Sequence, residues 1–252
     1  MAKTIAIVNQ KGGVGKTTTC VNLTAALKER DKSVLLCDFD PQANATSGMG
    51  VDKTLSKGIY NVLIGEVTAQ EALVHTRFGD VLPSNKALAG AGIELIAMDN
   101  REYLLRDAID QVKDQYDFVF VDCPPSLELL TLNALCAADA ILVPVQGEYF
   151  ALEGLSDLMN TVRIVRRSLN PALELDGVLL TMFDGRTNLA LQVAEEVKHY
   201  FPGKVFATVI PRNVRLSEAP SHGKPITAYD RTSRGAEAYT ALAAEFLKKQ
   251  SA

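Results

Sequence analysis

One short glycine-rich segment constrains this chain more than any other part of its sequence. It reads Lys11-Gly12-Gly13-Val14-Gly15-Lys16-Thr17-Thr18, directly after an apolar run at 4–9 and before a segment of helical apolar period. Such glycines let successive backbone N–H groups point at phosphate oxygens, and the start of the following helix adds partial positive charge. Lys16 is then expected to reach the β- and γ-phosphates of a nucleotide, and the Thr17 hydroxyl to contact Mg²⁺. The segment predicts a strand, a phosphate-binding loop and a helix, in that order.

Short apolar runs alternate with helical patterns along the chain, which is typical of a parallel sheet covered by helices. We expect strands at 4–9, 33–38, 118–122, 140–145, 175–182 and 205–209. We expect helices at 17–30, 101–115, 152–169, 188–200 and 234–249. The strand runs are continuously apolar, as in strands that are buried on both faces. The predicted fold class is α/β, a doubly wound, mostly parallel sheet with helices on both faces, in one domain over 1–252.

The composition excludes several classes of protein. The chain has 26 Lys and Arg against 30 Asp and Glu, a formal charge of −4, so bulk charge does not draw it to nucleic acid. Its four cysteines have neither Cys-x-x-Cys nor zinc-ligand spacing, which favours free thiols in a reducing compartment. No apolar run approaches the roughly 20 residues of a membrane span, and no leader pattern opens the chain. We therefore expect a cytoplasmic protein.

Three carboxylates stand where predicted strands end. The run 118–122 is apolar up to Asp122, which puts an acid at a carboxyl strand end, where it can orient Mg²⁺ directly or through water. Asp38 ends the strand predicted at 33–38 and Asp40 follows it, and their two-residue spacing directs both side chains to one side. Together with the glycine-rich loop, these acids predict one site for magnesium and phosphate.

The glycine-rich loop departs from the ordinary P-loop pattern in a specific way. Gln10 stands where that pattern has its first glycine, and a second lysine, Lys11, follows it. The combination resembles the deviant Walker A motif of the ParA/MinD superfamily of P-loop ATPases. The resemblance implies a Mg²⁺-dependent ATPase in which Lys11 crosses to the nucleotide of a partner subunit, so that a homodimer forms with ATP. A second cation at a triphosphate also makes charge-assisted hydrogen bonds.

Further motifs resemble the ParA/Soj branch of that superfamily over essentially the whole chain. They are Asp38-Phe39-Asp40-Pro41-Gln42-Ala43-Asn44, a switch I segment, Cys123-Pro124-Pro125-Ser126, a switch II segment, and residues 210–226. The resemblance implies that Asp40 orients or activates the attacking water and that Asp38 supports the metal shell. The expected catalytic group is Lys11, Lys16 and Asp40. The expected metal group is Thr17, Asp38 and Asp122. The expected adenine-binding residues are Met182, Pro211, Arg212 and Asn213.

The last part of the chain carries a modest excess of positive charge. Residues 181–252 hold 10 Lys and Arg against 7 Asp and Glu, whereas the rest of the chain is net negative. A solvated surface explains such an excess by itself. The ParA resemblance implies instead that the ATP dimer binds double-stranded DNA non-specifically, with Arg186 and Arg215 on its phosphates, and associates with the nucleoid. It also implies a ParB/Spo0J-type partner that stimulates hydrolysis and release.

Two other branches of the superfamily supply alternative functions. A MinD-like membrane switch requires a terminal amphipathic helix that inserts into lipid. Tyr239, Leu242 and Phe246 form a helical stripe near the carboxyl end, but core packing explains it better, and we expect no stable membrane association. An electron-transferring iron protein needs paired cysteines, whereas Cys136 lies in an apolar helical stretch where burial is expected. Chromosome and plasmid cargo both fit the sequence.

Overall fold

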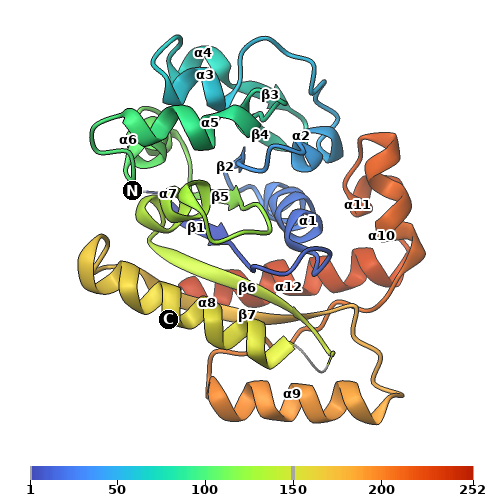
Figure 1. Cartoon of the computed structure of the whole chain (residues 1–252). Helices are drawn as coiled ribbons and strands as arrows, with labels where there is room; N and C mark the ends of the chain where they lie inside the picture. Colours follow the sequence, from blue (N-terminus) through green and yellow to red (C-terminus); the bar gives the residue numbers. More distant parts are fainter. Residues whose placement is uncertain (1, 149–150, 252) are drawn as a thin grey trace.

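A seven-stranded sheet organises the computed structural model, which describes residues 2–148 and 151–251 (Figure 1). The strands are β1 (Lys3–Ile7), β2 (Val34–Asp38), β3 (Val74–Thr76), β4 (Gly79–Leu82), β5 (Phe118–Asp122), β6 (Ala140–Gln146) and β7 (Glu174–Thr181). Their order is β3-β4-β2-β5-β1-β6-β7; β3 pairs antiparallel with β4, and the other neighbours pair in parallel. Because β1 lies between β5 and β6, the loop after β1 lies where the strand order reverses. Ligands usually bind at this point in sheets of this kind.

Helices connect the strands and cover both faces of the sheet (Figure 1). The longer ones are α1 (Lys16–Lys28), α7 (Leu129–Ala137), α8 (Ala151–Ser168), α9 (Asn188–Tyr200) and α12 (Arg234–Gln250). The shorter ones are α2 (Asn44–Gly48), α3 (Ile59–Leu63), α4 (Ala69–Ala72), α5 (Leu88–Glu94), α6 (Leu104–Asp110), α10 (Val214–Glu218) and α11 (Ile226–Tyr229). Short 3₁₀ helices are η1 (Leu95–Ala97), η2 (Lys113–Gln115) and η3 (Ala219–His222). The α/β fold class that the sequence predicts is confirmed.

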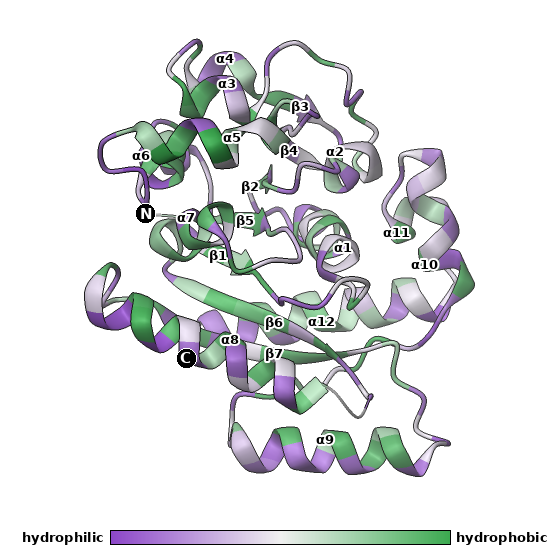
Figure 2. Cartoon of the chain, viewed as in Figure 1, coloured by the Kyte–Doolittle hydropathy of each residue, from purple (hydrophilic) through white to green (hydrophobic). Residues whose placement is uncertain are grey.

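The central strands bury side chains on both faces, which explains their continuously apolar sequences. In β1, Ile5 and Ile7 belong to a core cluster with side chains of α1 and α12, whereas Ala6 belongs to a second cluster with side chains of α6, α7 and α8. Figure 2 agrees with this: β6 is green along most of its length, whereas α8 carries both green and purple residues. At about 25 cal/mol per Å² of apolar surface removed from water, these clusters supply the main stabilising contribution.

Five of the six predicted strands are confirmed, with ends that shift by at most two residues. The strand expected at 205–209 is wrong. Val205 makes only an isolated bridge to β7, and the Ala207 and Thr208 N–H groups donate to the Glu245 carboxylate, at 2.7 and 2.8 Å, instead of to a neighbouring strand. β3 and β4 were not predicted, because strands of three and four residues show no clear apolar pattern.

The predicted helices are confirmed at 188–200 and, with one further residue, at 234–249. The helix expected at 101–115 is only partly formed, since α6 covers Leu104–Asp110 and the 3₁₀ helix η2 follows. Likewise α1 ends at Lys28, two residues early, because Asp31 has a φ of 58° and reverses the chain there. Helix boundaries of this kind depend on the residues after the apolar pattern rather than on the pattern itself.

The carboxyl-terminal helix α12 packs into the core. Tyr239, Leu242 and Phe246 are fully buried, and the Phe246 ring lies 5.2 Å from Phe118 and 5.7 Å from Phe120 between ring centroids. The expected core packing of this helical stripe is therefore confirmed. Within residues 2–148 and 151–251, no helix has the length and apolar character needed to cross a bilayer.

Two glycines bring distant segments into direct backbone contact. Gly50 follows α2 with a φ of 77°, and Gly223 follows η3 with a φ of 60°. A Cβ added to Gly50 would lie 2.8 Å from the Gly223 carbonyl oxygen, and one added to Gly223 would lie 2.9 Å from Gly50 Cα. The contact therefore has no room for a side chain on either residue.

Candidate functional site

The phosphate-binding loop lies between β1 and α1, as the sequence predicts. Gly13 and Gly15 have φ values of 74° and 89°, a left-handed conformation that glycine adopts without steric cost. Asn9 fixes the start of the loop: its Oδ1 accepts from the Lys11 N–H at 3.0 Å, and its Nδ2 donates to a β6 carbonyl at 2.8 Å. Gly12 and Gly13 are exposed. The loop is thus anchored to the sheet and accessible from its outer side.

Lys16 begins α1, and its side chain turns back toward the loop. The residue is only 6% exposed, and its Nζ donates to the Lys11 carbonyl at 2.9 Å. Burial lowers the pKa of Lys16, and nearby carboxylates, chiefly Asp122, act in the opposite direction. An ammonium has three donors, of which this carbonyl uses one. Lys16 is therefore placed to hold the loop and an anion together.

Asp122 ends β5 directly beside Asp38, because the two residues are register partners in adjacent parallel strands. Asp122 is fully buried, and its Oδ2 has no hydrogen-bond partner among the described residues. Burial and then the Asp38 charge raise the pKa of Asp122, whereas the Thr17 hydroxyl and the Lys16 ammonium lower it. A buried carboxylate oxygen without a donor, near a threonine hydroxyl, fits a hard cation such as Mg²⁺ that takes oxygen ligands.

Asp38 and Asp40 organise the segment that follows β2. Asp38 Oδ2 accepts from the Thr46 N–H at 2.6 Å and the Thr46 hydroxyl at 2.7 Å, and its Oδ1 accepts from the Asp40 N–H at 3.2 Å. Burial raises the pKa of Asp38 to about 6, against the effect of these hydrogen bonds. Asp40 is 7% exposed and accepts from the Gln42 N–H at 2.9 Å. In the described part of the chain, no three His, Cys, Asp or Glu side chains form a complete metal cluster, so a cation here needs further oxygens from a ligand.

A pocket of about 310 Å³ adjoins the loop near the carboxyl end of β7. It brings the expected adenine-binding residues together with the phosphate-binding loop. Its lining includes Gly15, Thr18, Met182, Pro211, Arg212 and Asn213. Met182 has a φ of 47°, which is uncommon for a residue with a side chain and turns the chain sharply after β7. A partly apolar pocket beside a phosphate-binding loop has the composition that suits a nucleotide base.

Sequence reasoning missed two residues that join the loop to this pocket. Gln146, the last residue of β6, donates from Nε2 to the Gly13 carbonyl at 2.9 Å and to the Met182 sulfur at 2.8 Å. Thr181, the last residue of β7, donates from its hydroxyl to the Val14 carbonyl at 2.8 Å. Both are polar residues at the carboxyl ends of apolar parallel strands, and that position is the signal that could have identified them.

Lys11 lies on the side of the loop that faces α8. A Cβ added to Gly154 would lie 3.3 Å from Lys11 Cε and 3.6 Å from Lys11 Cδ, so the lysine stem packs over this glycine. Gln10 contacts the same helix, because its Nε2 donates to Asp157 Oδ2 at 3.1 Å. The start of α8 is therefore the neighbour of both residues that distinguish this loop from the ordinary pattern.

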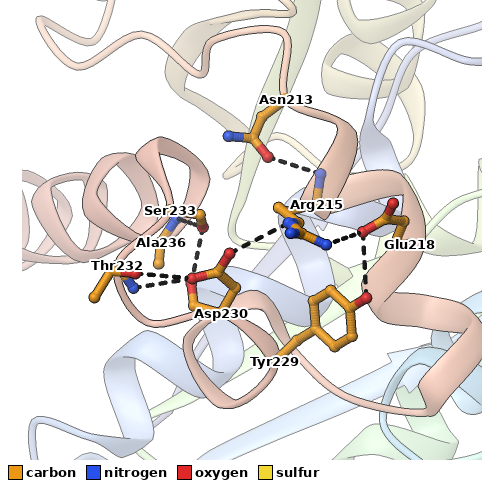
Figure 3. Close-up of polar contacts among 8 residues, drawn as sticks. All are labelled: Asn213, Arg215, Glu218, Tyr229, Asp230, Thr232, Ser233 and Ala236. Atoms are coloured by element: carbon orange, nitrogen blue, oxygen red, sulfur yellow. Dashed lines mark hydrogen bonds and ion pairs between the residues drawn. The ribbon is translucent and has the colours of Figure 1, made fainter.

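The two arginines expected to contact DNA are surface residues outside the pocket lining. Arg186 precedes α9, with a side chain that is 89% exposed and paired with Asp184. Arg215 lies in α10, is 54% exposed and pairs with Glu218 and Asp230 (Figure 3). Their DNA contacts remain a prediction, and their ion pairs were not anticipated from the sequence.

All four cysteines are buried free thiols, namely Cys20, Cys37, Cys123 and Cys136. The expected burial of Cys136 is thereby confirmed. Burial raises the pKa of the Cys136 thiol to about 11, with a smaller contribution from Glu102. A buried, protonated thiol is a poor nucleophile and a poor metal ligand.

Comparisons with known sequences agree with this geometry. Residues 2–175 match the protein family described as an AAA domain. The chain is 57% identical over 248 residues to the sporulation initiation inhibitor protein Soj of Bacillus subtilis (strain 168), covering 97% of this chain and 98% of that protein. It is 52% identical over 252 residues to the chromosome partitioning protein ParA of Myxococcus xanthus (strain DK1622), covering 99% of this chain and 89% of that protein.

A solved structure shares the fold over the whole chain. It is described as cobyrinic acid a,c-diamide synthase from Mycobacterium smegmatis with bound ATP analogue and magnesium, and it matches at a TM-score of 0.88 and 37% sequence identity. The match covers 100% of this chain and 97% of that one. The similarity to the Soj and ParA proteins extends over nearly the full length of the chain, and the loop with two lysines fits the same family. This chain belongs to the ParA/Soj family of chromosome-partitioning ATPases.

Proposed function

We propose that this chain is an ATP-dependent molecular switch that partitions chromosomes or plasmids. One observation carries the proposal: a phosphate-binding loop with two lysines, carboxylates at neighbouring strand ends and a base-sized pocket adjoin one another. The chain is 52% identical to the chromosome partitioning protein ParA of Myxococcus xanthus and only 37% identical to the diamide synthase structure, which favours partitioning over amide synthesis. The proposed reaction is the hydrolysis of ATP by water to ADP and phosphate.

The proposed nucleotide lies across the start of α1. Residues 11–18 surround its phosphates, and Lys16 contacts the β- and γ-oxygens through the two donors that the Lys11 carbonyl leaves. The base occupies the pocket lined by Met182, Pro211, Arg212 and Asn213. Thr17 and Asp122 would hold Mg²⁺, with Asp38 supporting this arrangement from the adjacent strand. When bound, the ion neutralises charge on the triphosphate.

Asp40 is the residue that we expect to orient the attacking water. A hydrogen bond from the Gln42 N–H holds its Oδ1, and Ser84 donates to its backbone carbonyl at 2.8 Å. A carboxylate that is fixed in this way accepts from a water and holds it in line with the γ-phosphorus. Lys16 and Lys11 stabilise the negative charge that the phosphate oxygens carry during the transfer.

Lys11 is the residue that we expect to act across a dimer interface. It stands on the accessible side of the loop, beside the exposed Gly12 and Gly13, on a stem that packs over Gly154. In an ATP homodimer, each Lys11 contacts the nucleotide of the partner subunit with charge-assisted hydrogen bonds. Because ADP lacks the γ-phosphate, it supports this contact less well. Dimerisation then depends on ATP.

The dimer is proposed to bind double-stranded DNA without sequence preference, through Arg186 and Arg215. Both side chains are exposed, and phosphate contacts carry no base information. This binding would associate the ATP form with the nucleoid. A ParB/Spo0J-type partner would then stimulate hydrolysis and release the protein from DNA.

The DNA proposal is tested by binding of unrelated duplexes across a salt series with ATP, with ADP and without nucleotide. Each phosphate contact contributes about 0.9 to the salt slope, and the dimer carries each arginine twice. Arg186→Glu and Arg215→Glu should therefore each lower the slope by about 2 and leave ATP affinity unchanged. Arg106→Glu, a charge reversal on α6, is the matched control. Parental DNA affinity and slope in both test variants would show that these arginines are not the DNA surface.

A further inference from the structure

Both arginines proposed to contact DNA are already bound to carboxylates of their own chain. Arg186 donates from Nε to Asp184 Oδ1 at 2.8 Å and from Nη2 to Asp184 Oδ2 at 2.7 Å. Arg215 donates from Nη1 to Glu218 Oε2 at 2.8 Å, and its Nε lies 3.4 Å from Asp230 Oδ2 (Figure 3). We refer to Asp184, Glu218 and Asp230 as the acidic partners.

The acidic partners of Arg215 are held by further contacts. Glu218 Oε2 also accepts from the Tyr229 hydroxyl at 3.2 Å. Asp230 Oδ1 accepts from the Thr232 N–H at 3.3 Å and the Thr232 hydroxyl at 3.1 Å, while Oδ2 faces Arg215 (Figure 3). Because these carboxylates are already ordered, pairing with the arginine costs less side-chain entropy than it does between two mobile groups. The ordered carboxylates thus stabilise the ion pairs of Arg215 on the protein surface.

Asp184 is ordered in a similar way. Its Oδ1 also accepts from the Arg186 N–H at 3.1 Å. Hydrogen bonds from the Arg186 side chain and backbone lower the pKa of Asp184 to about 2. An ordinary aspartate has a pKa of about 3.9, so Asp184 carries its charge over an even wider pH range. The competitor of Arg186 is therefore ionised in any neutral buffer.

A guanidinium recognises carboxylates and phosphates through the same pairs of N–H donors. The side-on pair consists of Nε and Nη2, and the end-on pair consists of Nη1 and Nη2. In Arg186 the carboxylate fills the side-on pair, while Nη1 and the second N–H of Nη2 still form an end-on pair. In Arg215 the Nε of the side-on pair faces Asp230, and one of the two N–H groups of Nη1 donates to Glu218. A phosphate can therefore use the side-on pair of either arginine only after Asp184 or Asp230 moves away, and the carboxylates also offset the guanidinium charge that attracts it.

We propose that the acidic partners compete with DNA phosphates for Arg186 and Arg215 and so weaken the DNA binding of each subunit. The inference rests on the proposed function, in which these arginines contact duplex DNA. The carboxylates also repel the DNA backbone, so one subunit alone binds duplex weakly. An ATP dimer presents every contact twice, and linked contacts raise the overall affinity. The acidic partners thus make DNA binding depend more strongly on dimerisation.

Glu218→Gln and Asp184→Asn each remove a competing charge and keep an oxygen acceptor of similar shape. An exposed ion pair changes an equilibrium by up to about fivefold, and the dimer contains two copies of each pair. We expect each substitution to tighten ATP-dependent binding of unrelated duplexes about two- to tenfold, measured by fluorescence anisotropy. The salt slope should also become steeper, because the freed arginines neutralise more phosphate charge.

Two controls separate local competition from a change in net charge. Glu174→Gln removes one exposed carboxylate at the amino-terminal end of β7 and should leave duplex affinity unchanged. In an Arg215→Ala background, Glu218→Gln should give a smaller gain than in the parent, because the donor for which Glu218 competes is absent and only its repulsion of the duplex is removed. Calorimetric ATP binding by every variant verifies that the nucleotide site is intact.

Tighter binding by Glu218→Gln and Asp184→Asn, but not by Glu174→Gln, would support the competition. Unchanged or weaker binding by both test variants, in a parent that binds duplex through its arginines, would overturn the inference and leave the proposed function standing. An equal gain in all three variants would also overturn it, because bulk charge would then explain the effect. A parent that binds no duplex with ATP would refute the DNA proposal, and the inference with it.

Discussion

Replacing Lys16 with alanine tests the phosphate-binding loop most directly. In the free chain, the Lys16 ammonium gives one of its three donors to the Lys11 carbonyl at 2.9 Å, so two donors remain for ATP oxygens. A hydrogen bond to a charged group contributes about 1.5–3 kcal/mol, and two bonds from one ammonium favour the upper part of that range. We take about 2–3 kcal/mol, which corresponds to a loss of ATP affinity of about 30- to 160-fold. Isothermal titration calorimetry of Mg·ATP binding to the parent and to Lys16→Ala measures this loss of affinity.

Lys11→Ala is the matched control, since it removes the other lysine of the same loop. Within one subunit the Lys11 side chain is not expected to contact the nucleotide, so ADP affinity should stay within about threefold of the parent, a free-energy change below about 0.7 kcal/mol. The ATP dimer should be lost in sedimentation velocity. ATP affinity of Lys16→Ala within about threefold of the parent, in a variant that unfolds at the parental temperature, would refute the assigned role of Lys16. A normal ATP dimer of Lys11→Ala would refute the cross-subunit contact.

Three further substitutions have expected outcomes. Asp40→Ala should keep Mg·ATP affinity and lower steady-state hydrolysis by at least about 100-fold, which leaves a trapped ATP dimer; parental turnover in a phosphate-release assay would contradict this. Gly223→Ala adds left-handed strain and a Cβ 2.9 Å from Gly50 Cα, and should lower the free energy of urea unfolding by about 2–4 kcal/mol. Its control is Gly203→Ala, where φ is 73° and no atom lies within 4 Å of the added Cβ, so the loss should be only about 1 kcal/mol. Asn22→Ala leaves the buried N–H that begins α11 without its acceptor at 2.6 Å and should cost about 1–3 kcal/mol by the same measurement.

Local signals explain what could be predicted from the sequence. The strand Phe118–Asp122 was predicted with its observed ends, because a continuously apolar run stops at an acid. The loop and Lys16 were predicted because the glycine pattern, strand and helix are contiguous. The strand expected at 205–209 is wrong for the opposite reason, since the Ala207 and Thr208 N–H groups donate to Glu245, 37 residues beyond Thr208. Contacts of this kind have no signature in the segment itself, and the pairing of Asp230 with Arg215 is a second example.

The pairing of Asp38 with Asp122 limits how this protein can tolerate insertions and deletions. The two acids are register partners, so hydrogen bonds between β2 and β5 fix their separation, whatever the length of the loops that follow. Successive side chains of a strand point to opposite faces, so adding or removing one residue inside either strand would turn its carboxylate away from the site. The separation of the two acids therefore does not depend on the loops after β2 and β5, whereas an insertion or deletion of one residue within either strand would separate them even if every motif residue were retained.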